Sequence, residues 1–512
     1  MSEMRTCDIT GLKIDKTAET MVKLNITTAI IFLAVGGAAA LLVLLTRWPA
    51  IHLLPVEWYY RWLTAHGLVA LIVWILFFEI GLVYFGSAIL LNTRIAAPLL
   101  AKVVYGMMLV GVSLVAVMVL IGKADVLFTS YVPLQANPLY YLGIVIAAVG
   151  MLLGFIHFFI NVAVAKKEGK YKKTLPLVAF GIMAASIIGI LTIAHGAAIY
   201  IPTFIWSLND FLADQGMAPI IQNIDPEAYR LVWWGLGHPS QQINVCMMVA
   251  MWYMTAAFLF DAKPLSEKLC RTAFVLYILF INVASEHHLL VDPVLSTWHK
   301  IVNTSYVMHL AVLASMIHAF AVPAAMEAAL RKKGYTNGLF EWLKKAPWGN
   351  PGFSAIFISI ILFGFLGGIT GVIFGTEQFS IIRHNTWAIT GHFHGTVVAG
   401  TTIAFMGAAY QFIPIFFRRE LILPAVAKIQ PFVYGLGVMI LSICMMAAGS
   451  FGVPRRHWDY NFSDAPFDYE FDPTVGIFMD LTGVGGVIAT VGGAMFIVVT
   501  LGSIFAGKKI EK

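Results

Sequence analysis

Long apolar runs separated by short polar stretches make up most of this chain. A helix needs about 20 apolar residues to cross a bilayer, and the sequence holds twelve runs of that length. They cover residues 26–46, 66–91, 100–122, 139–165, 173–201, 231–260, 269–290, 301–328, 352–375, 386–416, 425–450 and 474–505. We therefore expect an all-α, polytopic membrane protein with twelve transmembrane helices, in which residues 1–512 form a single transmembrane domain.

The composition agrees with this expectation. Hydrophobic residues make up 59% of the 512 residues and charged residues only 12%, which is too apolar for a soluble domain of this length. The four cysteines form no C-x-x-C pair, so the sequence predicts neither a disulfide framework nor a thiolate metal site.

The distribution of positive charge predicts the orientation. Most of the 33 Lys and Arg residues lie in the two termini and in the loops after even-numbered spans. By the positive-inside rule, both termini are expected on the cytoplasmic side. The net charge of +6 reflects this bias and predicts no nucleic-acid partner. The expected outer loops 202–230 and 451–473 are rich in aromatic and acidic residues, which fits either partner docking or a simple lid over the spans.

Six histidines fall inside the spans at one expected depth. They are His66, His238, His287, His288, His392 and His394. With a rise of 1.5 Å per residue, all six come within roughly 10 Å of the outer boundary. Histidine is costly in a membrane unless it is paired or ligates something, and neutral imidazole is a common ligand of iron and copper. A cluster of metals is the simplest explanation.

Local spacing divides the histidines into groups. His392 and His394 are about 200° apart around a helix, so they face different neighbours and can serve two haems. His287 and His288 are about 100° apart and can flank one ion, with His238 as a third nitrogen ligand. His66 and His394 can then clamp one haem, which leaves His392 for a second haem that faces the three-histidine metal.

Four segments carry a resemblance to a known family. They are HNTWAITGHFHG at 384–395, GHPSQQ at 237–242, SEHHLLVDP at 285–293 and GVPRRHWDY at 452–460. They resemble the catalytic subunit (subunit I) of the haem–copper oxidase superfamily, closest to its B-type branch, and the likeness covers nearly the whole chain. The resemblance implies the subunit I fold.

The resemblance also implies ligand roles. It places His66 and His394 on a low-spin haem and His392 on a high-spin haem. It places His238, His287 and His288 on the copper ion CuB. Haem propionates would be held by Arg455 and Arg456, because guanidinium groups suit carboxylates, and His384 and Asn385 would lie near the propionates.

The sequence departs from the oxygen-reducing members at one functional position. A- and B-type oxidases carry a tyrosine, cross-linked to a copper histidine, where this chain has Gln242. C-type oxidases carry it on the seventh span, where this chain has Ile281. Tyr277 lies roughly 16 Å below His288 along a helix, too far away for such a cross-link.

This departure changes the expected reaction. One-step cleavage of dioxygen needs four electrons, one of them lent by the tyrosine, whereas joining two nitric oxide molecules needs only two electrons and two protons. Glu286, beside His287, adds a carboxylate that is costly at membrane depth unless it is neutralised. We expect Gln242 and Glu286 to be catalytic-site residues, with Glu286 as proton donor. The pattern resembles the divergent, copper-containing nitric oxide reductases (eNOR-like).

Three functions are compatible with these observations. The favoured one is a respiratory membrane oxidoreductase that reduces nitric oxide to nitrous oxide at a high-spin haem/CuB centre fed by a low-spin haem. The alternative is an oxygen-reducing terminal oxidase, a cytochrome c or quinol oxidase, with an unusual active site. A twelve-span transporter would place its site near the midplane between repeats, and the sequence shows no repeat.

Protons and electrons need routes to this site. The B-type resemblance implies a proton path below the metals, through Tyr253, Tyr277, Ser315 and His318; isolated interhelical hydrogen bonds are the alternative. The chain lacks a C-x-x-C-H haem motif. We therefore expect a smaller membrane-anchored electron-donor subunit, fed by quinol, cytochrome c or a cupredoxin, in the plasma membrane of a prokaryote.

Overall fold

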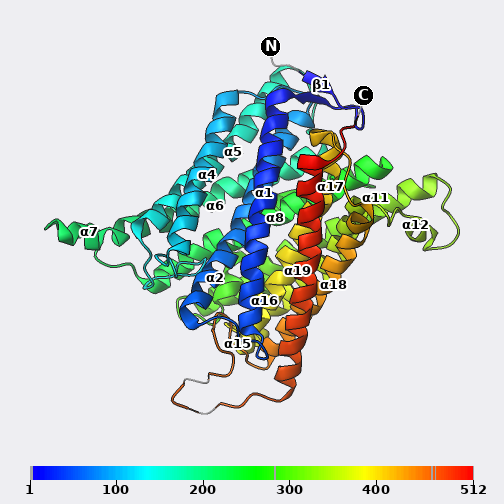
Figure 1. The fold of residues 1–512 in the computed structure, drawn as a ribbon. Coiled ribbons are helices and arrows are strands. Elements are labelled where there is room, and N and C mark those ends of the chain that lie inside the picture. Colours follow the sequence, from blue (N-terminus) through cyan, green and yellow to red (C-terminus); the bar gives the residue numbers. More distant parts are fainter. Residues whose placement is uncertain (1–3, 282–283, 463–464, 468, 511–512) are drawn as a thin grey trace.

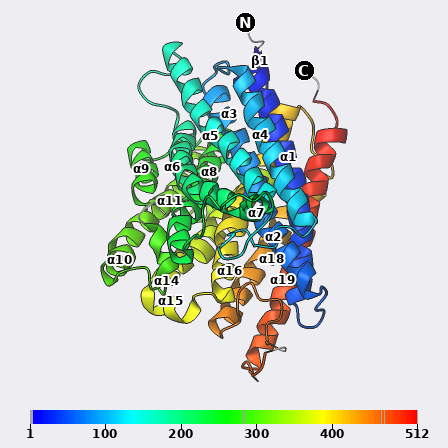
Figure 2. The same ribbon diagram turned by 90° about the vertical axis from the view of Figure 1, so that its left-hand side faces the viewer.

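The computed structural model describes residues 4–281, 284–462, 465–467 and 469–510, and it shows a bundle of long, roughly parallel helices (Figures 1 and 2). Two short strands come first, β1 (Met4–Thr6) and β2 (Lys13–Asp15). The α-helices of the first half are α1 (Lys16–Arg47), α2 (Val56–Leu68), α3 (Trp74–Tyr84), α4 (Pro98–Leu120), α5 (Pro138–Lys167), α6 (Leu177–Ser207), α7 (Asn209–Asp214) and α8 (Pro226–Phe260). Those that follow are α9 (Glu267–Ile281), α10 (Thr297–Val302), α11 (Met308–Lys332), α12 (Glu341–Lys344), α13 (Pro351–Leu362), α14 (Thr370–Phe374), α15 (Glu377–Arg383), α16 (Trp387–Phe393), α17 (Ile403–Phe412), α18 (Pro424–Ser450) and α19 (Thr474–Ala506).

Short segments of tighter or wider helix join several of these elements. One is a 3₁₀ helix, η3 (Ala284–Leu289), and the others are π-helical: η1 (Val69–Val73), η2 (Phe85–Ile89), η4 (Asn303–Val307), η5 (Phe363–Ile369), η6 (His394–Thr402) and η7 (Ile413–Phe417). Such π segments are frequent at functional sites. Here η6 begins at His394 itself, so the helix changes its winding immediately after His392.

The prediction of a polytopic helical membrane protein is confirmed. Within the described residues, eleven helices are long and apolar enough to span a bilayer. The predicted count of twelve is not confirmed, because the expected seventh span, 269–290, consists of α9 with 15 residues, two residues outside the described ranges, and then η3. α9 alone is too short for a span of about 20 residues.

Two predicted boundaries were wrong. The second span begins at Val56, ten residues before the predicted start at 66, because the amphipathic segment VEWYYRWLTA is already helical. Aromatic residues such as these are favoured where a helix enters the membrane interface. The predicted outer loop 202–230 is also shorter, since α6 continues to Ser207, α7 follows, and α8 begins at Pro226.

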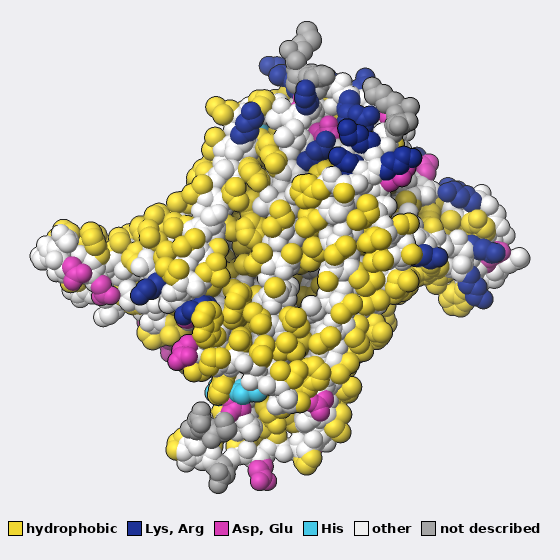
Figure 3. Space-filling model, in the orientation of Figure 1, with side chains coloured by type: hydrophobic (Ala, Val, Ile, Leu, Met, Phe, Trp, Pro, Cys, Tyr) yellow, Lys and Arg dark blue, Asp and Glu magenta, His cyan; other side chains and the backbone are white. Residues whose placement is uncertain are grey.

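Both chain termini lie at the same end of the bundle (Figure 1). β1 pairs antiparallel with β2 there, and Asp15 caps α1 by accepting hydrogen bonds from the backbone N–H groups of Thr17 and Ala18. Lys and Arg side chains gather at this end of the face shown in Figure 3. This asymmetry is the one from which the sequence predicts a cytoplasmic location for both termini, and that orientation stays a prediction.

Candidate metal centre

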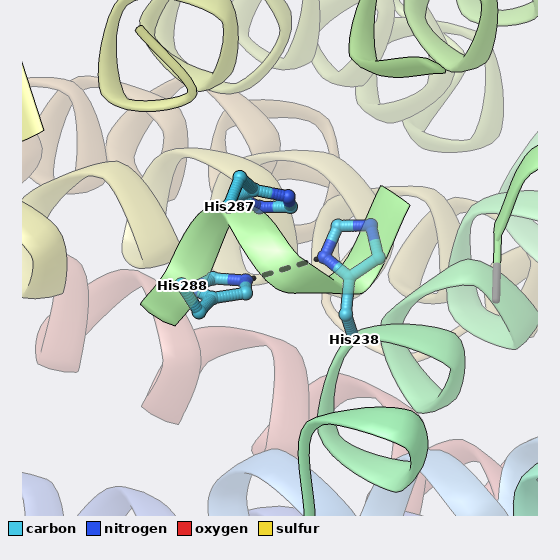
Figure 4. A group of neighbouring side chains, drawn as sticks. All are labelled: His238, His287 and His288. Carbon is cyan, nitrogen blue, oxygen red and sulfur yellow. Dashed lines mark hydrogen bonds between the residues drawn. The ribbon is translucent and has the colours of Figure 1, made fainter. Parts of the chain in front are cut away.

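Three imidazoles from two distant segments meet near one end of α8. His238 lies on α8, and His287 and His288 lie on η3 (Figure 4). One nitrogen from each ring can be chosen so that all three lie within 4.8 Å of one another. Nδ1 of His238 is 3.2 Å from Nε2 of His288. The fold therefore brings the three predicted nitrogen ligands together. Their spacing allows all three to bind one transition-metal ion.

Trp234 supports this group from one side. Its ring stacks on His288, with centroids 3.8 Å apart and planes 12° from parallel. Trp234 stands one turn before His238 on α8, so one helix supplies both a ligand and the surface that orients another ligand. Sequence reasoning missed Trp234, although its i, i+4 spacing from His238 was a usable signal.

His66 and His394 face each other as predicted. Their ring centroids are 6.2 Å apart, with planes 22° from parallel. Nδ1 of His394 contacts the carbonyl oxygen of Thr390 at 2.8 Å, and Nδ1 of His66 contacts that of Gly36 at 3.5 Å. Both Nδ1 atoms thus face the backbone, the arrangement that fixes ring orientation and leaves Nε2 for a metal.

His392 faces a different set of neighbours from His394. Its Nδ1 lies 2.8 Å from the hydroxyl oxygen of Thr370, and its ring lines the same cavity as His287 and His288. A β-carbon at Gly371 would stand 3.3 Å from Cε1 of His392, so glycine keeps that edge of the ring open. The predicted division of labour between the two histidines agrees with these contacts.

Three arginines and a histidine line another part of this cavity. Arg230, His384, Arg455 and Arg456 all belong to its wall. Burial, with the neighbouring charge of Arg456, lowers the pKa of Arg455 to about 9, and burial lowers the pKa of His384 to about 4. Nε of Arg455 and Nε of Arg230 are buried without a hydrogen-bond partner among the described residues. Buried donors need acceptors, so this wall fits anionic groups such as carboxylates.

Hydrogen bonds and an ion pair hold the segments that carry these side chains. The N–H of Arg455 donates to the carbonyl of Asn385 at 3.0 Å, and Asn385 and Arg456 have φ values of 59° and 63°. Arg230 forms an ion pair with Asp292 at 2.9 Å, and Nε2 of His384 lies 4.0 Å from the same carboxylate. Sequence reasoning missed Arg230, which is far from Asp292 along the chain.

Gln242 and Glu286 occupy different surroundings. Gln242 is buried, with 8% exposure, one turn beyond His238 on α8 as predicted. Glu286 is half-buried. Its carboxylate lies outside the three-histidine ligand group of the described residues. Glu286 is thus next to His287 in the chain but is no fourth ligand in this arrangement.

The four residues of the predicted proton path form two hydrogen-bonded pairs. The hydroxyl of Tyr253 lies 3.0 Å from Nδ1 of His318, and the hydroxyl of Tyr277 lies 2.8 Å from that of Ser315. The rings of Tyr277 and His318 are 5.7 Å apart and nearly parallel, which joins the two pairs. The structure brings all four together on α8, α9 and α11; whether they conduct protons stays a prediction.

Comparison with known proteins gives a consistent result. The family described as "Cytochrome C and Quinol oxidase polypeptide I" matches residues 20–488. The chain is 29% identical over 427 residues to cytochrome c oxidase subunit 1 of Thermus thermophilus, covering 81% of this chain and 72% of that protein. It is 24% identical over 447 residues to quinol oxidase subunit 1 of Bacillus subtilis, covering 83% and 63%.

A solved structure shares the fold. It is described as the cryo-EM structure of a heme-copper terminal oxidase dimer, and it superimposes with a TM-score of 0.88 at 24% identity. The match covers 98% of this chain and 86% of that chain. The expectation of a subunit I fold is confirmed.

The family binds two haems and CuB, and the residues of this chain fit all three groups. Metal–imidazole bonds are about 2 Å long, so the 6.2 Å between the His66 and His394 centroids accommodates one ion between the rings. His392 lines a cavity. In the wall of this cavity, the unpaired Nε donors of Arg230 and Arg455 suit the carboxylates of haem propionates. Motifs, fold and ligand geometry agree, and the chain belongs to the haem–copper oxidase subunit I family.

Proposed function

We propose that this chain is the catalytic subunit of a nitric oxide reductase of the haem–copper type. The observation that carries the proposal is Gln242, which lies one turn beyond the copper ligand His238 where oxygen-reducing relatives carry a redox-active tyrosine. An amide forms hydrogen bonds but lends no electron. The other known tyrosine position is Ile281, the last residue of α9.

The proposed reaction is 2 NO + 2 e⁻ + 2 H⁺ → N₂O + H₂O. A high-spin haem held by His392 and a copper ion held by His238, His287 and His288 would supply the two electrons, so that no electron from a tyrosine is required. The protein supplies the enclosure and the protons. Trp234 stacks on His288, Thr370 contacts His392, and Gln242 is buried one turn beyond His238 on the same helix. Ligands that are held in place in this way would position the reacting molecules.

Glu286 is the proposed proton donor for this reaction. It adjoins His287 and is partly shielded from solvent. In this proposal protons reach the site from the inner side along the Tyr253–His318 and Tyr277–Ser315 pairs. A general acid of this kind typically contributes 10²- to 10⁴-fold to the rate.

Oxygen reduction is the second candidate. Its support is the similarity of this chain to subunit 1 of a cytochrome c oxidase and of a quinol oxidase. Either reaction needs an electron source, and we propose a smaller membrane-anchored donor subunit that receives electrons from quinol, cytochrome c or a cupredoxin, with both chain termini on the cytoplasmic side of a prokaryotic plasma membrane.

Parallel assays separate the two candidates. Purified protein with its haems and copper is supplied with one chemical electron donor and then with either nitric oxide or oxygen. Rapid nitric oxide consumption with slow oxygen consumption supports the proposal. Rapid oxygen consumption with negligible nitric oxide turnover would replace it by the terminal oxidase.

A further inference from the structure

Glu79, which has no role in the site described above, is fully buried inside the helical bundle. Glu79 lies on α3 and has 0% exposure. Its Oε2 has no hydrogen-bond partner, and no ion pair includes it, among the described residues. The contrast is Glu19 on α1, also buried, which is paired with Arg5 and Lys23. An isolated carboxylate without a cation is strongly disfavoured in such a place.

One contact shows how Glu79 is accommodated. The side-chain amide of Asn244, on α8, reaches Oε1 of Glu79 at 2.8 Å. The amide can present either its oxygen or its nitrogen, and the choice depends on the neighbouring hydrogen bonds. If the oxygen faces Glu79, the carboxyl group must hold a proton, because two acceptors do not attract.

The Asn244 amide has two possible orientations, and each has its own set of partners. With its oxygen facing Glu79, Nδ2 of Asn244 donates to Oε1 of Gln241 at 2.9 Å, and Nε2 of Gln241 donates to the hydroxyl of Ser240 at 3.3 Å. That hydroxyl in turn donates to the carbonyl of Gly237 at 2.7 Å. In this orientation the chain of hydrogen bonds starts from a proton on Glu79.

Reversing the Asn244 amide has a definite consequence. Its nitrogen would then serve an ionised Glu79 and also reach the carbonyl of Ser240 at 3.3 Å, but its oxygen would face Oε1 of Gln241. The side-chain amide of Gln241 would then have to rotate as well, so that its oxygen, and no longer its nitrogen, faces the hydroxyl of Ser240. The charge state of Glu79 is therefore tied to the direction of a hydrogen-bond chain that ends at Gly237, the residue before the copper ligand His238.

We propose that Glu79 is a proton-storing carboxylic acid that releases its proton during turnover and recovers one from the inner side. In the release step the Oε–H bond breaks, the carboxylate keeps the electron pair, and the proton joins those that the reduction consumes. The Asn244 amide turns to stabilise the anion. The proposal rests only on a proton-consuming reduction, which both candidate reactions are.

The variant Glu79→Gln tests this directly. Glutamine can donate the same hydrogen bond to Asn244 permanently, but it cannot release a proton. We expect normal haem spectra, normal copper content and a loss of turnover of about tenfold or more. Redox-induced infrared difference spectra of the wild type should show a protonated carboxylic acid band that shifts in D₂O and is missing in Glu79→Gln. The matched control is Glu19→Gln, which should keep the band and the turnover.

Each other outcome overturns the proposal. If the band persists in Glu79→Gln, Glu79 is not the protonated acid. If the band is lost but turnover is unchanged, Glu79 only holds α3 against α8. If Glu79→Gln fails to assemble its haems, the variant Glu79→Asp is tested instead. Aspartate keeps a carboxylic acid at this position, so we expect it to support turnover and to shift the infrared band of the protonated acid. A band at the wild-type position in Glu79→Asp would contradict the proposal. Wild-type rates with nitric oxide and oxygen, measured first, keep this result separate from the choice of substrate.

Discussion

Nδ1 of His238 and Nε2 of His288 point at each other across 3.2 Å, although 50 residues separate them in the chain. His238 thus directs its Nδ1 atom, and His288 its Nε2 atom, toward the same point. The tertiary fold brings these two atoms together. The third imidazole, His287, meets the ring of His238 at right angles, with centroids 4.6 Å apart. The geometry suits a compact ion with three nitrogen ligands and an open position.

The non-haem metal should therefore be copper. We expect element analysis of the purified chain to give about one copper and two irons per protein. His288→Ala should lose the copper and most activity but keep the low-spin haem spectrum, because His66 and His394 are untouched. Three irons without copper would contradict the assignment and would direct attention to Glu286 as a metal ligand.

His394→Ala should abolish the low-spin haem signal. Its ring forms one side of the 6.2 Å pair with His66, and a haem held by one imidazole loses its six-coordinate state. The reduced-minus-oxidised spectrum measures this. His309→Ala is the matched control, because His309 is an exposed histidine on α11 and should leave the spectrum intact. An unchanged low-spin signal in His394→Ala would show that the ligand pair is wrong.

Tyr253→Phe should slow multiple-turnover catalysis and leave the haem spectrum unchanged. The variant removes the hydroxyl that contacts Nδ1 of His318 and so interrupts the predicted proton path without emptying the core. Tyr410→Phe is the control, since Tyr410 is also buried and has its own single partner, Gln430. Equal rates in wild type and Tyr253→Phe would count against the path.

Glu286→Gln should retain both haems and copper but lose nitric oxide turnover by about 100-fold. Glutamine keeps the size and hydrogen bonding of the side chain and removes only the titrating proton. Steady-state nitric oxide consumption and metal content are measured on the same sample. Full activity in Glu286→Gln would rule out this residue as the proton donor.

Gln242→Tyr alone should not create efficient oxygen reduction. The tyrosine would have to approach a copper histidine in one orientation, while the existing neighbours of His288, such as Trp234 at 3.8 Å, are packed for the present ring positions. Oxygen consumption by the variant measures this. Oxidase rates comparable to those of nitric oxide turnover would show that the residue at 242 by itself selects the substrate.

The sequence predicts that the six histidines gather at one level because their depth follows from topology. Once the direction of each span is known, His66, His238, His392 and the pair at 287–288 fall at one level, and helical geometry separates His392 from His394. Their meeting in space needs no further information beyond the packing of neighbouring helices.

The contacts that could not be predicted from the sequence are those between segments that lie far apart in the chain. The ion pair of Arg230 with Asp292 and the approach of Asn244 to Glu79 join residues whose proximity no periodicity encodes. The second helix starts early because residues 56–65 are amphipathic and not uniformly apolar, so a search for apolar runs does not detect them. The predicted seventh span is interrupted around His287 and His288, the predicted copper ligands, where η3 replaces regular α-helix.

The most direct test of the central claim is the product formed from nitric oxide by the purified, metal-replete protein. Nitric oxide loss is followed with an electrode and nitrous oxide is quantified by gas chromatography, with oxygen consumption measured under the same electron donor. We expect one nitrous oxide for every two nitric oxide molecules consumed, at a rate well above that of oxygen reduction. Rapid oxygen reduction with no nitrous oxide formed would contradict the proposed function.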